Sequence, residues 1–189
     1  MWWAILYFGS ATGVVLVGFW EDLAVLLPDW WLLWLMMGGV LIVGSLGALG
    51  YGWARRVFVP PRELIWDNPA LGLLTLDSRY LLSKTVEIFF QQVMIGLLVV
   101  WLHQAGGGLG MISTIGAVVF GLGHVYLIGL RGAVAGLWFV AASVIAGGVF
   151  PILILNIPAG LVYTFLIHLS AYIIVGIGCW IIGGRKSES

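Results

Sequence analysis

Three ionisable side chains interrupt otherwise apolar stretches of the sequence: Glu87, His124 and His168. Ionisable groups are costly inside a membrane, so each is by default a functional-site hypothesis. On three different helices, a carboxylate can remove a proton from water, one imidazole can hold that water, and the other can stabilise an oxyanion. The residue types therefore predict a hydrolytic centre. The alternative is three separate polar groups, each satisfied by packing against a neighbouring helix.

Each of these residues has a polar or aromatic neighbour four positions away in the sequence, namely Gln91, Phe120 and Tyr172 respectively. Residues four apart lie one above the other on the same face of a helix. Each pair would therefore face the same neighbouring helix, and we expect these three neighbours to support the site.

Other intramembrane chemistries lack their sequence signals. The chain has no His-Glu-x-x-His zinc motif, no Gly-x-Ser-x-Gly serine site and no aspartate within an apolar span. Its single cysteine, Cys179, has no partner for a disulfide or a thiolate metal site, and we expect a packed or lipid-facing thiol. A haem held by two of His103, His124 and His168 is an alternative, but it leaves Glu87 unexplained. We expect no metal and no cofactor.

The composition excludes a water-soluble globule. Of the 189 residues, 62% are hydrophobic and 8% are charged, whereas a soluble domain carries about 25% charged residues. The mean hydropathy is +1.12. These values predict an integral membrane protein with one domain, residues 1–189. The formal net charge is zero, so no basic field favours nucleic acid as a partner.

Six stretches are long and apolar enough to cross the bilayer. A helix that rises about 1.5 Å per residue needs about 20 residues for a core about 30 Å thick. The expected fold is therefore an all-α, polytopic transmembrane helical bundle with about six spans. Pro151 and Pro158 are expected to bound a short link between the last two. The expected spans are Trp2–Trp20, Trp30–Trp53, Thr85–Leu102, Leu109–Leu130, Ala133–Phe150 and Ala159–Ile182.

The charges predict the orientation of these spans. All eight basic residues fall on one side of the six-span arrangement, which the positive-inside rule assigns to the cytoplasm. Both termini are then cytoplasmic, and residues 54–84 form a cytoplasmic or interfacial segment. Two proline-containing pairs exclude one continuous helix there, while Arg62 and Trp66 suit an interfacial anchor. A role in substrate gating is an alternative to a plain connector.

The expected depths of the three ionisable residues differ. Glu87 falls in the first turn of the third span, and His124 lies roughly 9 Å from the cytoplasmic end of the fourth. His168 lies roughly 14 Å from the opposite end of the sixth span. The sequence leaves open whether His168 reaches the level of the other two.

The order and spacing of these residues resemble the CPBP family, the CAAX-processing and bacteriocin-processing glutamic intramembrane proteases. That family carries Glu-Glu-x-x-x-Arg on one helix, Phe-x-x-x-His on the next, and a later His-x-x-x-Asn or His-x-x-x-Asp. Here Phe120 and His124 match the second motif in full. His168 matches the third at its histidine, with Tyr172 in place of Asn or Asp. The resemblance covers residues 85–182, the protease-like core.

The first motif departs from the family pattern at two positions. If Phe90 sets the register, Glu87 takes the second Glu position, while Val86 replaces the first Glu and Gln91 replaces Arg. Sliding by one residue instead makes Glu87 the first Glu and places Gln92 at the Arg position. In the first register, one negative and one positive group are lost together. The formal charge of the motif stays at minus one, which favours a compensated site over a decayed one.

The resemblance implies a role for each site residue. Glu87 is the base, His124 its partner in activating water, and His168 an oxyanion donor, with the Tyr172 hydroxyl as a candidate second donor. The implied protein is a metal-independent intramembrane endopeptidase of a bacterial inner membrane. It would cleave a membrane-associated substrate at a leader peptide or a C-terminal sorting signal. The main alternative is a catalytically inactive, CPBP-like scaffold or binding protein; a small transporter is another.

Cysteine labelling tests the orientation in a Cys179→Ser background. In intact cells, Ala70→Cys should resist a membrane-impermeant thiol reagent, because residues 54–84 are expected to face the cytoplasm. Val25→Cys, between the first two spans, should be labelled. Labelling at position 70 with none at position 25 would reverse the orientation.

Overall fold

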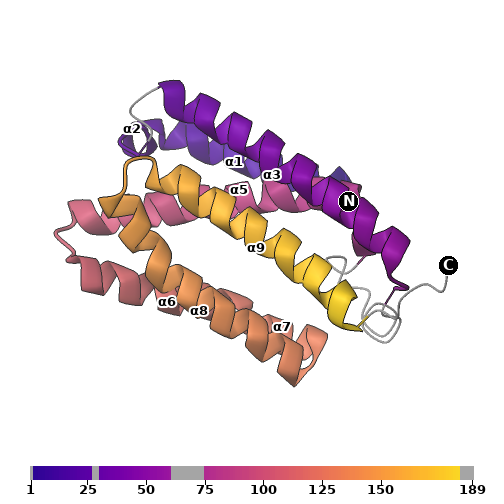
Figure 1. Cartoon of the computed structure of the whole chain (residues 1–189). Coiled ribbons are helices and arrows are strands. Elements are labelled where there is room, and N and C mark those ends of the chain that lie inside the picture. The colour runs from indigo at the N-terminus through magenta and orange to yellow at the C-terminus, as the bar shows by residue number, and fades with distance from the viewer. Residues whose placement is uncertain (1, 27–29, 61–74, 184–189) are drawn as a thin grey trace.

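The computed structural model describes residues 2–26, 30–60 and 75–183, and the elements within these ranges are helices (Figure 1). Apolar side chains dominate every long helix, as a bundle surrounded by lipid requires. The helices are α1 Trp2–Gly18, α2 Trp20–Ala24, α3 Trp30–Val57, α5 Ser78–Gln104, α6 Leu109–His124, α7 Tyr126–Arg131, α8 Ala133–Asn156 and α9 Gly160–Gly183.

The expected all-α membrane bundle is confirmed. Five helical stretches are long and apolar enough to cross a bilayer, and α1 is a shorter apolar helix of 17 residues. The five stretches lie in α3, α5, the consecutive pair α6 and α7, α8, and α9. The short helix α2 follows α1 where the sequence carries its first acidic residues, Glu21 and Asp22.

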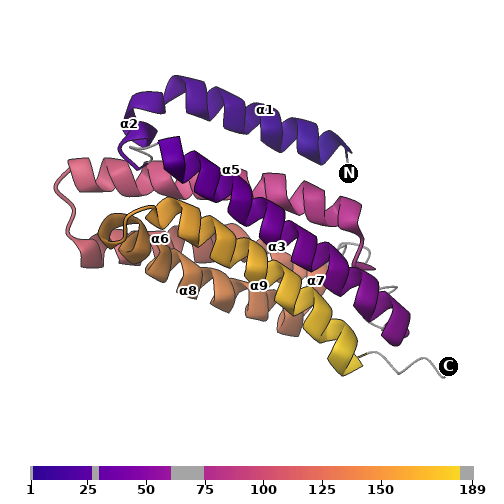
Figure 2. The same cartoon turned by 45° about the horizontal axis from the view of Figure 1, so that its top comes forward.

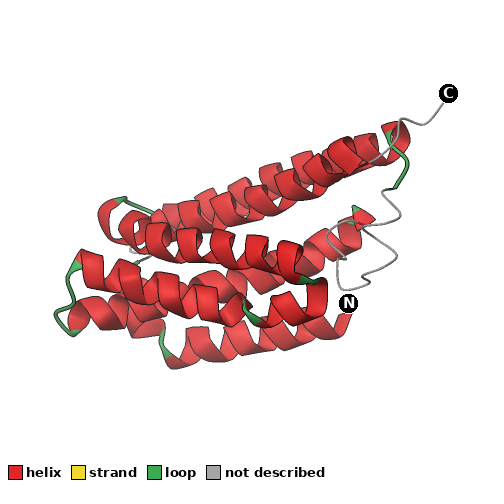
Figure 3. Ribbon diagram, turned by 90° about the horizontal axis from the view of Figure 1, so that it is seen from below, coloured by secondary structure: helices red, strands yellow, loops and turns green. Residues whose placement is uncertain are grey.

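The helix α5 lies in the middle of the bundle. It packs against α1, α9, α6 and α8, while α3 packs mainly on α9 (Figure 2). The helices α6 and α8 form the closest pair, and Figure 3 shows the same arrangement from below. Of the five spanning stretches, the one in α5 has the largest buried share and the one in α3 the smallest. The side chains of α5 therefore have the best access to the interior.

The third span begins earlier than the sequence suggested. Asp77 caps α5, because its carboxylate accepts a hydrogen bond from the backbone N–H of Arg79 at 2.9 Å. The helix therefore starts at Ser78 rather than Thr85, and Glu87 lies nine residues inside it rather than in its first turn. Lys84, expected in the connector, is part of the same helix.

The expected break at Pro151 is wrong, because α8 continues through this proline to Asn156. A proline inside a helix leaves the carbonyl four residues earlier without its usual donor. That carbonyl belongs to Gly147, which lies against the backbone of Gly116 on α6. Pro151 itself is fully buried beside Gly116. Close packing between α6 and α8 therefore offsets the lost bond.

The two ends of the bundle differ in charge. Arg55, Arg56, Arg79 and Lys84 lie toward the end where α3 and α9 finish and α5 starts. Glu21 and Asp22 lie at the opposite end. The predicted orientation of the spans rests on this separation of basic and acidic residues. Residues 61–74, with Arg62 and Trp66, and the C-terminal residues 184–189 lie outside the described residues.

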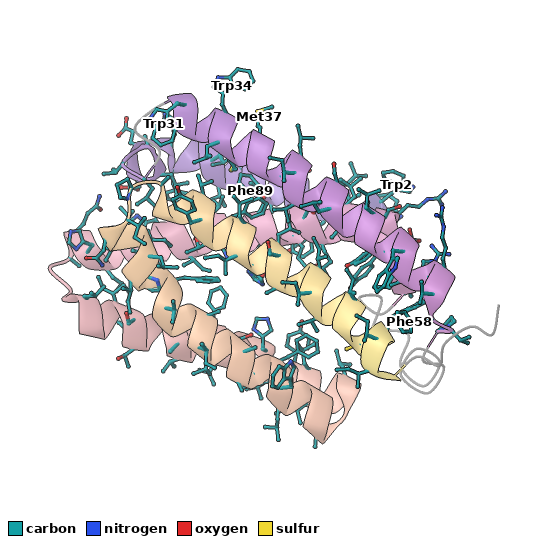
Figure 4. All side chains as sticks on the ribbon, viewed as in Figure 1. Trp2, Trp31, Trp34, Met37, Phe58 and Phe89 are labelled. Carbon is teal, nitrogen blue, oxygen red and sulfur yellow. The ribbon has the colours of Figure 1, made fainter. Side chains whose placement is uncertain are left out.

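Exposed tryptophans gather toward both ends of the bundle. Trp2 and Trp53 lie near one end, and Trp31, Trp34 and Trp101 near the other. Figure 4 shows Trp34 projecting outward from α3, in contrast to Phe89, which lies among the helices. Tryptophan is enriched at both membrane–water interfaces. The distribution supports the interpretation of the long helices as spans.

The contact between α6 and α8 can be tested with two alanine substitutions on one helix. Gly116→Ala would place a Cβ against the backbone carbonyl of Gly147, so it should lower the unfolding free energy by about 1–3 kcal/mol. Gly123→Ala has no atom within 4 Å of the added Cβ and should leave stability unchanged or raised. Thermal unfolding in detergent measures both, and equal effects would contradict the close contact.

Candidate functional site

All six predicted site residues line one cavity of about 550 Å³. Helices α5, α6, α7, α8 and α9 contribute to its wall. In Figure 1, α8 and α9 meet at the turn that joins them and diverge toward α7. Apart from a few polar groups, the wall is apolar. The predicted residues on it are Glu87, Gln91, Phe120, His124, His168 and Tyr172.

The carboxylate of Glu87 is paired with a lysine that was not among the predicted site residues. Lys84 Nζ lies 2.7 Å from each of the two carboxylate oxygens, and these side chains are 13% and 22% exposed. Gln91 Nε2 donates to Glu87 Oε1 at 3.4 Å. The spacing of three residues between Lys84 and Glu87 was the available signal. It did not identify the pair, because a lysine just before an apolar stretch ordinarily indicates a segment outside the membrane.

Two tyrosine rings surround the ammonium group of Lys84. Its Nζ lies 5.8 Å from the centre of the Tyr80 ring and 5.3 Å from that of Tyr172. Such cation–π contacts favour a cation that is partly removed from water. Tyr172 thereby connects α9 to the ion pair on α5. The structure gives this tyrosine a contact that its predicted role as an oxyanion donor did not include.

His124 is the last residue of α6, and its ring is held by its own helix. Nδ1 lies 2.8 Å from the backbone oxygen of Phe120, and the two rings stack at 6.2 Å and 28°. A carbonyl oxygen can only accept, so Nδ1 carries the proton. In the neutral imidazole, Nε2 then has a lone pair. This arrangement gives the cavity a group that can accept a proton.

His168 is held from the neighbouring helix by Gln92. Gln92 Nε2 lies 3.1 Å from His168 Nδ1, and the ring of Phe150 packs against the imidazole at 5.9 Å. Gln92 is buried and is not part of the cavity wall, so it holds the imidazole from behind. The hydrogen bond places His168 at the level of Gln92, five residues after Glu87 on α5 or about 7.5 Å along the helix axis.

Val86 and Glu87 lie on different faces of α5. An added Cβ at Gly9 of α1 would lie 4.0 Å from Val86 Cγ1, so Val86 faces α1. Glu87 faces the cavity with His124 and His168. Of these two neighbouring residues, the carboxylate is therefore the one that faces the cavity.

The remaining histidine lies elsewhere. His103 is exposed near the end of α5 that joins α6, and it is not on the cavity wall. Within the described ranges, no three His, Cys, Asp or Glu side chains are grouped so as to hold a metal ion. The geometry of this cavity is that of separate acid–base groups on facing helices.

The comparisons with known proteins give no match to a family model, to a curated protein or to a solved structure. The resemblance to the CPBP family therefore rests on the motif residues themselves. Those residues lie on α5, α6 and α9. The cavity they share is a property of this chain's own structure.

A double-mutant cycle tests the ion pair. Lys84→Met should lower the unfolding free energy, because it leaves a carboxylate without its cation in an apolar wall. Adding Glu87→Gln should recover much of that loss, with a coupling of about 0.5–3 kcal/mol between the two positions. Unfolding in detergent measures each variant. Additive effects would show that the pair contributes nothing to stability.

Proposed function

We propose that this protein is a metal-independent intramembrane endopeptidase of the CPBP type. The observation that carries the proposal is the shared cavity of Glu87, His124 and His168, each from a different helix. A carboxylate, an imidazole with an available Nε2 and a second imidazole are the groups that water-mediated peptide hydrolysis needs.

The proposed reaction uses these groups in turn. Water held between Glu87 and His124 Nε2 attacks the peptide carbonyl, and Glu87 takes the proton of the water. His168 donates a hydrogen bond to the oxyanion of the tetrahedral intermediate. The proton then passes to the amine as the C–N bond breaks. Lys84 Nζ contacts both oxygens of Glu87, so this contact must loosen when the carboxylate accepts the proton.

The apolar wall supports a substrate that is itself associated with the membrane. Side chains such as Ile145, Ile167 and Val175 line the cavity and suit an apolar peptide segment rather than a charged one. The proposed substrate is a leader peptide or a C-terminal sorting signal, and the proposed location is a bacterial inner membrane with the basic end of the bundle in the cytoplasm.

One observation favours a second function. Both carboxylate oxygens of Glu87 contact Lys84, an arrangement that suits a structural ion pair as well as a base. The second candidate is therefore a catalytically inactive scaffold that binds a membrane protein through the same cavity.

Isotope labelling separates the two functions even when the substrate is unidentified. Proteoliposomes containing the chain and membrane proteins from its native cell are incubated in water enriched in oxygen-18. Hydrolysis places the label in each new C-terminal carboxylate, which mass spectrometry identifies. We expect labelled termini with the wild type and a loss of about 10²–10⁴-fold with Glu87→Gln, because the base is removed. A chelator should change nothing.

The matched control is Glu21→Gln, a carboxylate at the other end of the bundle and outside the cavity wall. This variant should label the same termini as the wild type. Equal labelling with wild type and Glu87→Gln would contradict the peptidase and favour the scaffold.

A further inference from the structure

The most deeply buried amide among the described residues is that of Gln92, whose side chain is 1% exposed in the middle of α5. An amide without hydrogen-bond partners is costly in an apolar interior. Around Gln92, the neighbours Leu16, Phe89, Val93 and Phe165 are apolar. Its polar contact is His168 Nδ1 at 3.1 Å, and Gln92 Oε1 has no partner. An amide kept at this cost needs a reason beyond packing.

The hydrogen bond fixes which nitrogen of His168 carries the proton. The amide nitrogen of Gln92 is a donor, so His168 Nδ1 accepts and the proton of the neutral ring is on Nε2. The opposite amide orientation would leave both N–H groups of Gln92 unpaired. Buried N–H groups without partners are rarer than under-satisfied carbonyl oxygens. The assigned orientation is the less costly one.

The two imidazoles of the cavity are thus held in opposite tautomers. The Phe120 carbonyl keeps the proton of His124 on Nδ1, and Gln92 keeps that of His168 on Nε2. His124 can then accept a proton or a hydrogen bond at Nε2, whereas His168 can donate one at Nε2. Accepting and donating are different roles. If each ring exchanged freely between its two tautomers, each would be in the tautomer that its role needs only part of the time.

We propose that Gln92 is a positioning residue that holds His168 as a hydrogen-bond donor, in contrast to the proton-accepting His124. Gln92 acts through the His168 ring and does not contact the substrate. The use of the His168 N–H toward an oxyanion rests on the proposed peptidase function. The assignment of the tautomers does not, because it depends on the two hydrogen bonds alone.

Nitrogen-15 NMR of the full-length protein in lipid nanodiscs, with labelled histidine, tests this inference. The chain has three histidines, so the spectrum is simple, and the loss of signals in His103→Gln and His168→Asn assigns it. At a pH well above the ordinary imidazole pKa of about 6.5, protonated and unprotonated ring nitrogens are resolved by their shifts. We expect a proton on Nε2 of His168 and on Nδ1 of His124. A proton on Nδ1 of His168 would overturn the proposal.

Two variants on adjacent residues complete the test. Gln92→Met keeps a similar side-chain length but removes the donor, so His168 should lose its single tautomer. Gln91→Met removes an amide that contacts Glu87 instead, and it should leave the His168 signals unchanged. An unchanged His168 tautomer in a folded Gln92→Met variant would overturn the role of Gln92. The wild-type spectrum decides the tautomer even where that variant does not fold.

Turnover distinguishes this inference from the proposed function. In the labelling assay, Gln92→Met should lower the rate of label incorporation by up to about 10²-fold, because a misoriented donor stabilises the transition state less well. The expected tautomers without any turnover in the wild type would refute the peptidase and still support the positioning role. Turnover in the wild type with His168 protonated at Nδ1 would support the peptidase and refute the positioning role of Gln92.

Discussion

The interior of a bilayer has no water to hydrogen-bond a polar side chain, so every such group must find its partner within the protein. The site depends on this constraint. Glu87 pairs with Lys84 on its own helix, and His124 bonds the carbonyl of Phe120 one turn earlier. His168 obtains its hydrogen-bond partner from another helix, across the contact between α9 and α5. Each partner that reduces the cost of burial also fixes the orientation of a reactive group.

The cavity exists because α6 and α8 approach each other much more closely than α8 and α9 do. Lipid chains are as apolar as leucine, so helices in a membrane associate mainly through close packing and small residues. Gly116 and Gly147 bring the backbones of α6 and α8 into contact, and Pro151 is accommodated at the same place. Because α8 runs alongside α6, α8 diverges from α9 beyond the turn that joins α8 to α9. The space between α8 and α9 forms part of the cavity.

Length, hydropathy and motif spacing predicted the membrane bundle and six of the residues that line its cavity. The errors arose where a group outside the apolar stretch in question decides the outcome. The Asp77 cap extends α5 and brings Lys84 into the bundle, whereas the charge of Lys84 had suggested a connector. Pro151 looked like a helix end because its compensating contact is on α6. The bond from Gln92 to His168 joins residues 76 positions apart, and its formation depends on how α9 packs against α5.

Lys84 also changes the charge balance of the altered first motif. Counting Val86, Glu87 and Gln91 alone gives a formal charge of minus one, but Lys84 contacts both oxygens of Glu87 and brings the local sum to zero. The cation thus comes from three residues before the carboxylate, where the family pattern has an arginine after it. His168 is neutral in this arrangement, because its Nδ1 accepts a hydrogen bond. A wall with one paired carboxylate and a neutral imidazole is less costly to enclose in apolar side chains than one with an unpaired charge. An arginine after the carboxylate, as in the family that the motif resembles, is therefore not needed to balance the charge of Glu87.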